Sequence, residues 1–351
     1  MQALRLRTAG LDPELEEVPT PVPVGREVLV RVRAAGLCHS DLHVVESPVG
    51  GMATALPFTL GHEIAGEVAA LADDVAGTMP IGTAVAVYGP WGCGDCSRCR
   101  VGRDNLCDRR ASLTFFGAGL GRDGGMAEYV LVPRPELLVP LDGVDPLDAA
   151  PLTDAGLTSY AALRPLLPDL TGADASVLVL GVGGLGHMAV QLLSALTTAT
   201  VVAVDTKPAA LELAGDLGAI PVASGPDAGD RIREQLPAGA AGVDAVLDFV
   251  GAPETVALGS SLLRPGATYV LVGTAGGAID VRKNAGLPAG VKFSVPYWGG
   301  REELAELLAL AAQGRIHVHR QVYPLSDAAR ALADLRAGRI SGRAVLVPSP
   351  S

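Results

Sequence analysis

The chain is poor in aromatic residues and in basic charge. Phe, Trp and Tyr make up 4% of its 351 residues, and Asp, Glu, Lys and Arg together make up 19%. The formal net charge is -11, and no block of consecutive Lys or Arg interrupts the acidic balance. Such a field repels phosphate backbones, so nucleic acid is not expected as a partner.

An uninterrupted membrane-length apolar run is also missing, although apolar residues make up 49% of the chain. Residues 175–204 contain no charged side chain, but the glycines of GVGGLG at 181–186 divide them into parts shorter than the roughly 20 residues of a membrane-spanning helix. The N-terminal MQALRLRTAG has neither the apolar core nor the cleavage site of a signal peptide. We therefore expect no membrane partner, and 351 residues are enough for two domains.

Cysteine is scarce and unevenly placed. There are five cysteines, and four of them fall within fifteen residues in CGDCSRCRVGRDNLC. An odd number with this clustering favours metal ligation in a reducing compartment over disulfides. The cysteines therefore predict a cytoplasmic protein.

Two styles of sequence occur along the chain. The first part alternates short β-rich runs, such as EVLVRVRAAG and TAVAVYG, with Gly and Pro turns, which is typical of a small antiparallel sheet. From about residue 156, continuous apolar strands such as SVLVLG alternate with Ala- and Leu-rich helices, which predicts a doubly wound parallel sheet. The C-terminal part returns to the first style. We predict an α/β protein with an outer domain at 1–155 and 297–351 and an inserted domain at 156–296.

The inserted domain contains a dinucleotide-binding pattern. Gly181, Gly183 and Gly186 form G-x-G-x-x-G directly after a strand, and Asp205 closes the next strand. The glycines let the backbone approach a pyrophosphate at a helix N-terminus, and the carboxylate accepts hydrogen bonds from a ribose. Asp205 disfavours a 2'-phosphate, so NAD is preferred over NADP, and Lys207 softens that preference.

The cysteine cluster predicts a structural metal site. Cys93, Cys96, Cys99 and Cys107 have the spacing C-x2-C-x2-C-x7-C. Four thiolates satisfy tetrahedral zinc and leave no position for substrate. An iron–sulfur cluster is the rival interpretation, but the spacing matches neither of the common ferredoxin patterns.

The fifth cysteine, Cys38, lies in GLCHSDLH at 36–43. A catalytic zinc needs three protein ligands and one open position. His62, in LGHEIAGEV, is the second candidate, and Asp154 is a plausible third because it lies at the expected junction of the domains, where a cleft would open.

These motifs resemble a known family. GLCHSDLH, GHEIAGEV, the four-cysteine segment and GVGGLG with Asp205 occur in the order and spacing of the zinc-dependent medium-chain alcohol dehydrogenases, over essentially the whole chain. With Asp154 and PYWG at 296–299, the chain looks most like bacterial NAD-dependent secondary-alcohol dehydrogenases. The resemblance implies a GroES-like, mostly antiparallel β catalytic domain, with the structural zinc in a lobe at about 91–110, and a Rossmann domain.

The resemblance also implies residue roles. Cys38, His62 and Asp154 would hold a catalytic zinc, and Ser40 and His43 would relay a proton to solvent. Asp41 would orient the imidazole of His62, with Glu63 beside it, although a plain salt-bridge role for Asp41 and Glu63 stays open. The expected cofactor contacts are His39, Thr158, Gly181, Gly183, Gly184, Leu185, Gly186, Asp205, Lys207, Val250, Gly273 and Thr274, and the expected substrate pocket is Thr54, Leu120, Tyr297 and Trp298.

We therefore predict an oxidoreductase with two zinc ions per chain that transfers a hydride between NAD(H) and secondary alcohols or ketones. Three alternatives stay open: a polyol, amino-alcohol or pathway-specific dehydrogenase on the same scaffold, a non-catalytic zinc- and nucleotide-binding protein, and the zinc-free quinone reductases. A homodimer or homotetramer is expected, and the apolar run TYVLVG at 268–273 could pair across a two-fold axis.

Overall fold

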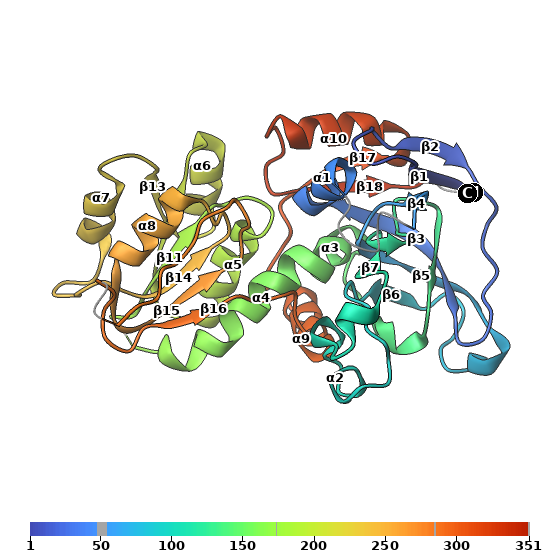
Figure 1. Ribbon diagram of the computed structural model, residues 1–351, viewed down its shortest axis with the longest axis horizontal. Helices are drawn as coiled ribbons and strands as arrows, with labels where there is room; N and C mark the ends of the chain where they lie inside the picture. Colours follow the sequence, from blue (N-terminus) through green and yellow to red (C-terminus); the bar gives the residue numbers. More distant parts are fainter. Residues whose placement is uncertain (48–54, 173, 284–285, 350–351) are drawn as a thin grey trace. The chain divides into compact units, whose positions relative to one another are not determined.

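The structure is a computed structural model that describes residues 1–47, 55–172, 174–283 and 286–349 (Figure 1). The chain folds into two compact units. Unit 1 comprises residues 1–157, 298–314 and 318–351, and unit 2 comprises residues 158–297 and 315–317.

Unit 1 is built around a seven-stranded sheet whose strands follow the order β10-β6-β5-β3-β18-β17, with β9 also pairing with β3. The pairs are antiparallel except β17 with β18. Most residues of β3 are buried, in agreement with its continuous apolar sequence. The strands are β3 (Val28–Leu37), β5 (Glu63–Leu71), β6 (Ala84–Val87), β9 (Tyr129–Val132), β10 (Leu138–Pro140), β17 (Arg320–Pro324) and β18 (Arg343–Val347).

Smaller elements complete unit 1. One antiparallel sheet has the order β2-β1-β4, and β7 pairs with β8. These strands are β1 (Gln2–Leu6), β2 (Glu14–Glu17), β4 (Phe58–Thr59), β7 (Gly117–Ala118) and β8 (Gly121–Arg122). The helices are α1 (His39–Glu46), α2 (Ser97–Arg100), α3 (Pro146–Pro151), α9 (Arg301–Ala312) and α10 (Ala328–Arg336), with short 3-10 turns η2 (Asp73–Val75), η3 (Asp104–Leu106), η4 (Arg110–Ser112), η5 (Pro135–Leu137) and η8 (Leu325–Asp327).

A π-helical turn, η6 (Leu152–Gly156), follows α3, and α4 (Leu157–Leu163) continues the chain from it. Helix α3 packs against β3 and β5. The chain therefore places the π-turn beside the sheet, and π-turns are frequent at functional sites.

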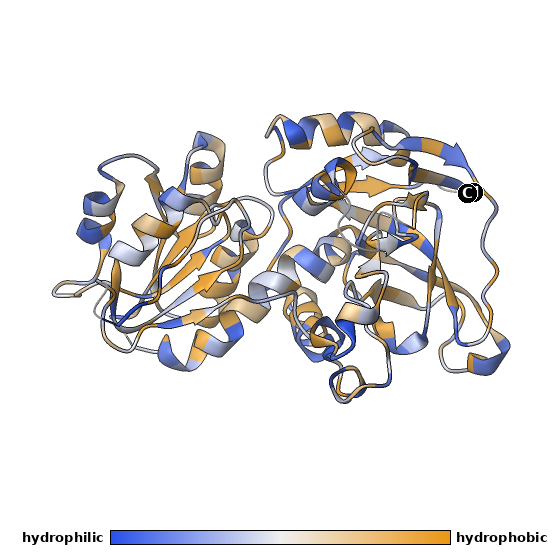
Figure 2. Ribbon diagram, in the orientation of Figure 1, coloured by the Kyte–Doolittle hydropathy of each residue, from blue (hydrophilic) through white to orange (hydrophobic). Residues whose placement is uncertain are grey.

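Unit 2 contains a six-stranded parallel sheet with the order β13-β12-β11-β14-β15-β16. Because the strand order runs outward in both directions from β11, right-handed crossovers put α5 and α6 on one face and α8 on the other. The strands are the apolar part of this unit in Figure 2. The elements are η7 (Arg164–Asp169), β11 (Ser176–Leu180), α5 (Gly186–Leu196), β12 (Thr200–Asp205), α6 (Pro208–Asp216), β13 (Ile220–Ala223), α7 (Ala228–Gln235), β14 (Val243–Asp248), α8 (Pro253–Ser261), β15 (Leu263–Leu271) and β16 (Lys292–Ser294).

The two sheets confirm the predicted α/β class. The suggestion that TYVLVG could pair with a second copy is wrong, because residues 268–271 of this run belong to β15, which already pairs with β14 on one side and β16 on the other. Both hydrogen-bonding edges of β15 are therefore occupied at residues 268–270. Among the residues described, no helix combines the length and the apolar character needed to span a membrane.

Candidate functional site

Four side chains of unit 1 that bind metals elsewhere in proteins converge in its interior. Cys38, His62, Glu63 and Asp154 are all buried, and one potential ligand atom of each lies within 4.8 Å of the others. Asp154 Oδ2 lies 3.5 Å from Cys38 Sγ and 3.5 Å from His62 Nε2. The three ligands expected from the sequence are therefore brought together from three separate segments of the chain.

Local structure explains how each ligand reaches this point. Cys38 is the N-cap of α1 and follows directly on β3. His62 immediately precedes β5, which pairs with β3 in antiparallel register. Asp154 lies in the π-turn η6, whose extra residue per turn changes the direction of the side chains that follow α3.

Asp41 holds both Cys38 and His62 in place. Its carboxylate is completely buried and accepts a hydrogen bond from the backbone N–H of Cys38 at 2.9 Å. The other carboxylate oxygen lies 3.2 Å from His62 Nδ1. A carboxylate behind Nδ1 leaves Nε2 as the nitrogen that faces Cys38 and Asp154, which is the usual arrangement of a metal-binding histidine.

A buried arginine, Arg343 of β18, lies on the other side of the cluster. Its guanidinium pairs with Glu63 Oε1 and lies 3.4 Å from Asp154 Oδ2. Glu63 Oε1 also accepts a hydrogen bond from the backbone N–H of Ala155 in the π-turn at 3.2 Å. Gly36 leaves the room for this carboxylate, because a Cβ atom there would lie 1.8 Å from Glu63 Oε2.

The charges of this cluster fit a cation. Burial lowers the pKa of His62, but the facing carboxylates of Asp41 and Asp154 outweigh that effect and raise it well above its usual value. For the Glu63 carboxyl, burial acts in the opposite direction and raises the pKa to about 7. Within the described part of the chain, Glu63 Oε2 is buried without a hydrogen-bond donor. An imidazole, a thiol and a carboxylate around one point form a donor set suited to zinc.

The two expected relay residues lie on α1. Ser40 Oγ is 3.6 Å from Cys38 Sγ, and both Ser40 and His43 are exposed. They are three residues apart on one helix and therefore share a face. His39, expected at the cofactor, is exposed at the first position of the same helix.

Trp298 borders the cluster in an unusual backbone conformation. Its indole contacts His62 edge to face, with ring centroids 5.8 Å apart, and its φ angle is 49°. The following turn is anchored, because Tyr88 Oη donates a hydrogen bond to Gly299 O at 2.6 Å. Of the other expected pocket residues, Leu120 is buried and Tyr297 is exposed, whereas Thr54 lies outside the described residues.

The four remaining cysteines form a second group in unit 1. The sulfur atoms of Cys93, Cys96, Cys99 and Cys107 lie within 4.8 Å of one another. Three of the Sγ–Sγ separations run from 3.4 to 4.0 Å. Zn–S bonds of about 2.3 Å in a tetrahedron require sulfur separations of about 3.8 Å, so the group fits zinc. The backbone of Cys99 lowers the pKa of the Cys96 thiol to about 7, which favours its thiolate form, whereas burial raises the pKa of the Cys93 and Cys99 thiols.

A buried ion network holds this cysteine lobe to the rest of unit 1. The completely buried carboxylate of Asp104 pairs with Arg134, and Arg301 Nε lies 3.1 Å from its other oxygen. Arg301, the first residue of α9, also donates to the carbonyl oxygen of Cys99 at 2.7 Å. The lobe is thus joined to α9 by the ion pair and the hydrogen bond of Arg301.

The glycine-rich segment of unit 2 forms a tight turn between β11 and α5. A Cβ atom at Gly186 would lie 1.8 Å from Gly181 O, so only glycine permits this approach. Asp205, at the end of β12, accepts hydrogen bonds from the backbone N–H of Val182 at 2.8 Å and of Lys207 at 2.9 Å. The other expected cofactor residues of unit 2 lie in α4 or in the loops that follow β11, β14 and β15: Thr158, Gly183, Gly184, Leu185, Val250, Gly273 and Thr274.

Comparisons with known proteins agree with these sites. The alcohol dehydrogenase GroES-like domain matches residues 25–143, and the zinc-binding dehydrogenase family matches residues 184–313. An NAD-dependent alcohol dehydrogenase from Sulfurisphaera tokodaii is 37% identical over 99% of this chain and 100% of its own length. The chain belongs to the zinc-dependent medium-chain alcohol dehydrogenase family. It is accordingly an oxidoreductase of the alcohol dehydrogenase kind.

Two further relatives of this alcohol dehydrogenase differ in their substrates. A D-arabinose 1-dehydrogenase (NADP(+)) from Saccharolobus solfataricus is 34% identical over 95% of this chain and 94% of its own length. The structure of an acetophenone reductase from Geotrichum candidum in complex with NAD is 30% identical, with a TM-score of 0.81 over 99% of this chain and 96% of that chain. The GroES-like and Rossmann folds expected from the sequence are thereby confirmed.

Sequence reasoning missed two residues of the alcohol dehydrogenase site. Arg343 stands in GRAVLVP, where a lone arginine in an otherwise apolar strand signals a buried ionic partner. Asp104 stands between Cys99 and Cys107, and its position alone gives no sign that it is completely buried. The ionic partners of both residues can be identified only once the fold is known.

Proposed function

We propose that this alcohol dehydrogenase is NAD-linked, contains two zinc ions per chain, and interconverts secondary alcohols and ketones. The observation that carries the proposal is the buried group of Cys38, His62 and Asp154, with the Asp41 carboxylate behind His62 Nδ1. Three protein ligands leave one position open, as catalytic zinc sites require.

A zinc ion held by these three side chains would supply the Lewis acidity that lowers the pKa of an alcohol hydroxyl. Asp41 fixes the imidazole orientation through Nδ1, and Arg343 balances the negative charge of Glu63 and Asp154. NAD would accept the hydride. The Cys93, Cys96, Cys99 and Cys107 group would hold the second zinc in a purely structural role, because four thiolates leave no open position.

The proton lost by the alcohol needs a route to solvent. Ser40, beside Cys38 Sγ, offers a hydroxyl close to the ligands, and His43 is exposed one helical turn further on α1. Imidazole exchanges protons with water near neutral pH. Ser40 would therefore accept the proton first, and His43 would release it.

The cofactor preference follows from Asp205. Its carboxylate, fixed by two backbone N–H groups, presents negative charge where an adenosine ribose would lie in this fold. Like-charge repulsion would disfavour a 2'-phosphate. The NAD of the acetophenone reductase complex and of the Sulfurisphaera relative supports the same preference.

The substrate class rests on Trp298. An indole edge against His62 would leave a small and a large space for the two substituents of a secondary carbinol. The acetophenone reductase acts on a ketone of this kind. The alternative, a sugar or polyol substrate, is favoured by the D-arabinose dehydrogenase relative.

We also propose that the protein is cytoplasmic and forms a homodimer or homotetramer. The free cysteines suit a reducing compartment.

Turnover and metal content test the function together. The purified protein is assayed with NAD(H) and NADP(H) against simple ketones, secondary alcohols, 2,3-diols and aldoses, and zinc is counted per chain. We expect two zinc ions, and the highest kcat/KM with NADH and a ketone. Asp154→Ala should lose one zinc and nearly all activity, whereas Asp154→Cys should keep both zinc ions. Two bound zinc ions without turnover would favour a non-catalytic protein, and highest kcat/KM with an aldose would favour the alternative.

A further inference from the structure

Asp248, the last residue of β14, is a completely buried carboxylate that four hydrogen-bond donors surround. Its Oδ1 accepts from the backbone N–H groups of Val250 at 2.9 Å and Gly251 at 2.8 Å. Its Oδ2 accepts from Thr255 Oγ1 at 2.9 Å and Tyr269 Oη at 2.8 Å. Each carboxylate oxygen therefore has two hydrogen-bond donors within reach, as a buried negative charge requires.

The backbone of the same residue holds a second loop. The carbonyl oxygen of Asp248 accepts from the N–H groups of Val272 at 2.8 Å and Gly273 at 2.9 Å. The loops after β14 and β15 then pair further, because Ala275 N donates to Val250 O at 3.1 Å and Gly277 N donates to Gly251 O at 2.7 Å. One residue therefore ties two neighbouring loops at the carboxyl edge of the parallel sheet.

The loop after β14 also packs against the glycine-rich turn. A Cβ atom at Gly181 would lie 2.7 Å from Val250 Cγ2, and one at Gly186 would lie 3.7 Å from the ring of Phe249. Val250 therefore packs closely against Gly181. Ligands of open α/β sheets bind at the carboxyl ends of the strands, where these loops meet.

We propose that Asp248 is a positioning residue for the dinucleotide: by fixing Val250 and Gly251, and through its carbonyl group Gly273, it sets the surface on which the cofactor is bound. The inference rests on the proposed use of NAD. Asp248 itself is buried behind the loops and does not act as a catalytic group. Its removal should therefore weaken cofactor binding and leave the metal sites of unit 1 unchanged.

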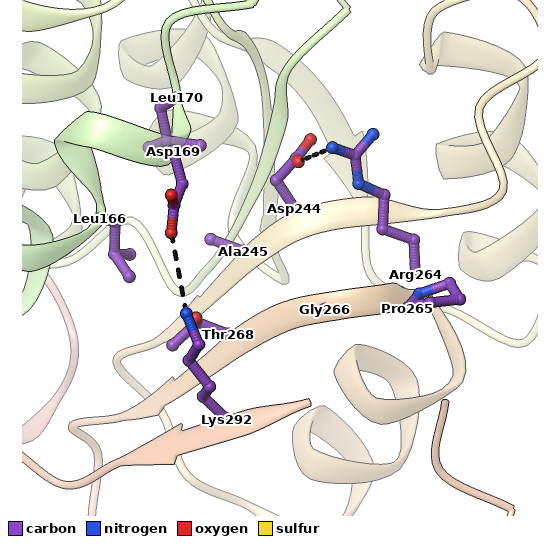
Figure 3. A pocket seen from close by; sticks show the side chains of 10 residues that line it. All are labelled: Leu166, Asp169, Leu170, Asp244, Ala245, Arg264, Pro265, Gly266, Thr268 and Lys292. Atoms are coloured by element: carbon purple, nitrogen blue, oxygen red, sulfur yellow. Dashed lines mark ion pairs between the residues drawn. The ribbon is translucent and has the colours of Figure 1, made fainter. Parts of the chain in front are cut away.

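The experiment compares Asp248→Leu with a matched carboxylate on the same strand. Asp244, at the opposite end of β14, accepts from Ser176 N at 2.9 Å and pairs with Arg264 at the edge of a small pocket (Figure 3). We expect Asp248→Leu to raise the Kd of NADH, measured by fluorescence, by about tenfold or more. Asp248→Asn, which keeps an acceptor for Val250 and Gly251, should stay within about threefold of wild type. Asp244→Leu should leave the Kd unchanged, and zinc content should be two in every variant.

Two results would overturn the positioning role. An unchanged Kd in Asp248→Leu is one, and an equal loss of affinity in Asp244→Leu is the other, since that would indicate general destabilisation. If Asp248→Leu does not fold, Asp248→Ala takes its place, because it also removes the acceptor of the Val250 and Gly251 N–H groups, and an unchanged Kd there has the same meaning. A wild-type protein that fails to bind NADH would instead overturn the proposed function and this inference with it.

Discussion

The indole of Trp298 meets the imidazole of His62 edge to face at a centroid distance of 5.8 Å, and the tryptophan adopts a left-handed φ of 49° to do so. A bulky residue with positive φ is strained, and such strain persists only where surrounding contacts impose it. Tyr88 supplies that constraint through Gly299 O, and Gly89 leaves space for the ring, since a Cβ atom there would lie 3.2 Å from it.

Replacing this tryptophan should change which ketones are accepted. Trp298→Leu enlarges the space beside His62, so the ratio of kcat/KM for acetophenone to that for acetone should shift by about tenfold, the scale of one pocket contact. Zinc content should stay at two. Trp91→Phe is the matched control, because Trp91 is buried in the same unit and its Nε1 donates to Tyr88 O. A ratio that moves less than twofold would remove Trp298 from the pocket.

Arg343 should be required for stability more than for chemistry. Arg343→Met leaves Glu63 and Asp154 buried without their cation, so the free energy of unfolding of the zinc-free protein should fall by about 3–5 kcal/mol. Adding Glu63→Gln should recover part of the loss, as a double-mutant cycle measures. Arg320→Met, in the neighbouring strand, removes a more exposed ion pair with Asp148 and should cost about 1 kcal/mol or less. Equal losses in both single variants would contradict this account.

The sequence was most informative where one local pattern determines one structure. The G-x-G-x-x-G turn, the cysteine spacing and the change from alternating to continuous apolar strands each depend on residues close together in the chain, and all three appear where the patterns placed them. Asp154 was only plausible from its position. The π-turn that carries it begins directly after Pro151, the last residue of α3, and was not predicted from the sequence.

Long-range ionic partners were the least predictable part of the site. Arg343 lies 280 positions from Glu63 in the chain, and Asp104 is joined to Arg301 of α9. In the sequence they look like ordinary charged residues, because their burial and their ion pairs arise only in the folded chain. The same limit applies to Asp248, whose four donors come from the backbone of one loop, from α8 and from β15.

The cysteine lobe should affect stability without affecting the chemical step. Cys96→Ser should reduce zinc from two ions to one per chain and lower the melting temperature by several degrees, because a structural zinc contributes its binding energy to folding. The kcat should stay within about threefold of wild type, since four-thiolate sites take no part in substrate binding. In Cys96→Ser the ion pairs of Asp104 with Arg134 and Arg301 still hold the lobe. Adding Asp104→Asn to Cys96→Ser should therefore lower the melting temperature further. Loss of turnover in Cys96→Ser alone would contradict the assignment.

The proposed proton relay through His43 predicts a pH-dependent defect. His43→Gln removes an exposed imidazole from α1, so alcohol oxidation should fall several-fold near pH 6.5 and recover by pH 9, where hydroxide and buffer accept the proton directly. Ser40→Ala should lower the rate at both pH values, because it interrupts the path before His43. A His43→Gln defect of equal size at every pH would remove the relay role and leave His43 as a surface residue.

Cofactor choice should respond to Asp205 and much less to Lys207. Asp205→Ser removes the carboxylate while a hydroxyl can still accept from Val182 N, so kcat/KM with NAD should fall by about tenfold and that with NADP should rise by a similar factor. Lys207→Ala, a change at an exposed side chain whose backbone N–H keeps its bond to Asp205, is the control and should alter the NAD to NADP ratio by less than about threefold. The two substitutions separate the effect of the acidic charge at Asp205 from the effect of the neighbouring basic charge at Lys207. If Asp205→Ser lowers both rates equally, the carboxylate acts only by fixing the glycine-rich turn, and discrimination against the 2'-phosphate must come from elsewhere in unit 2.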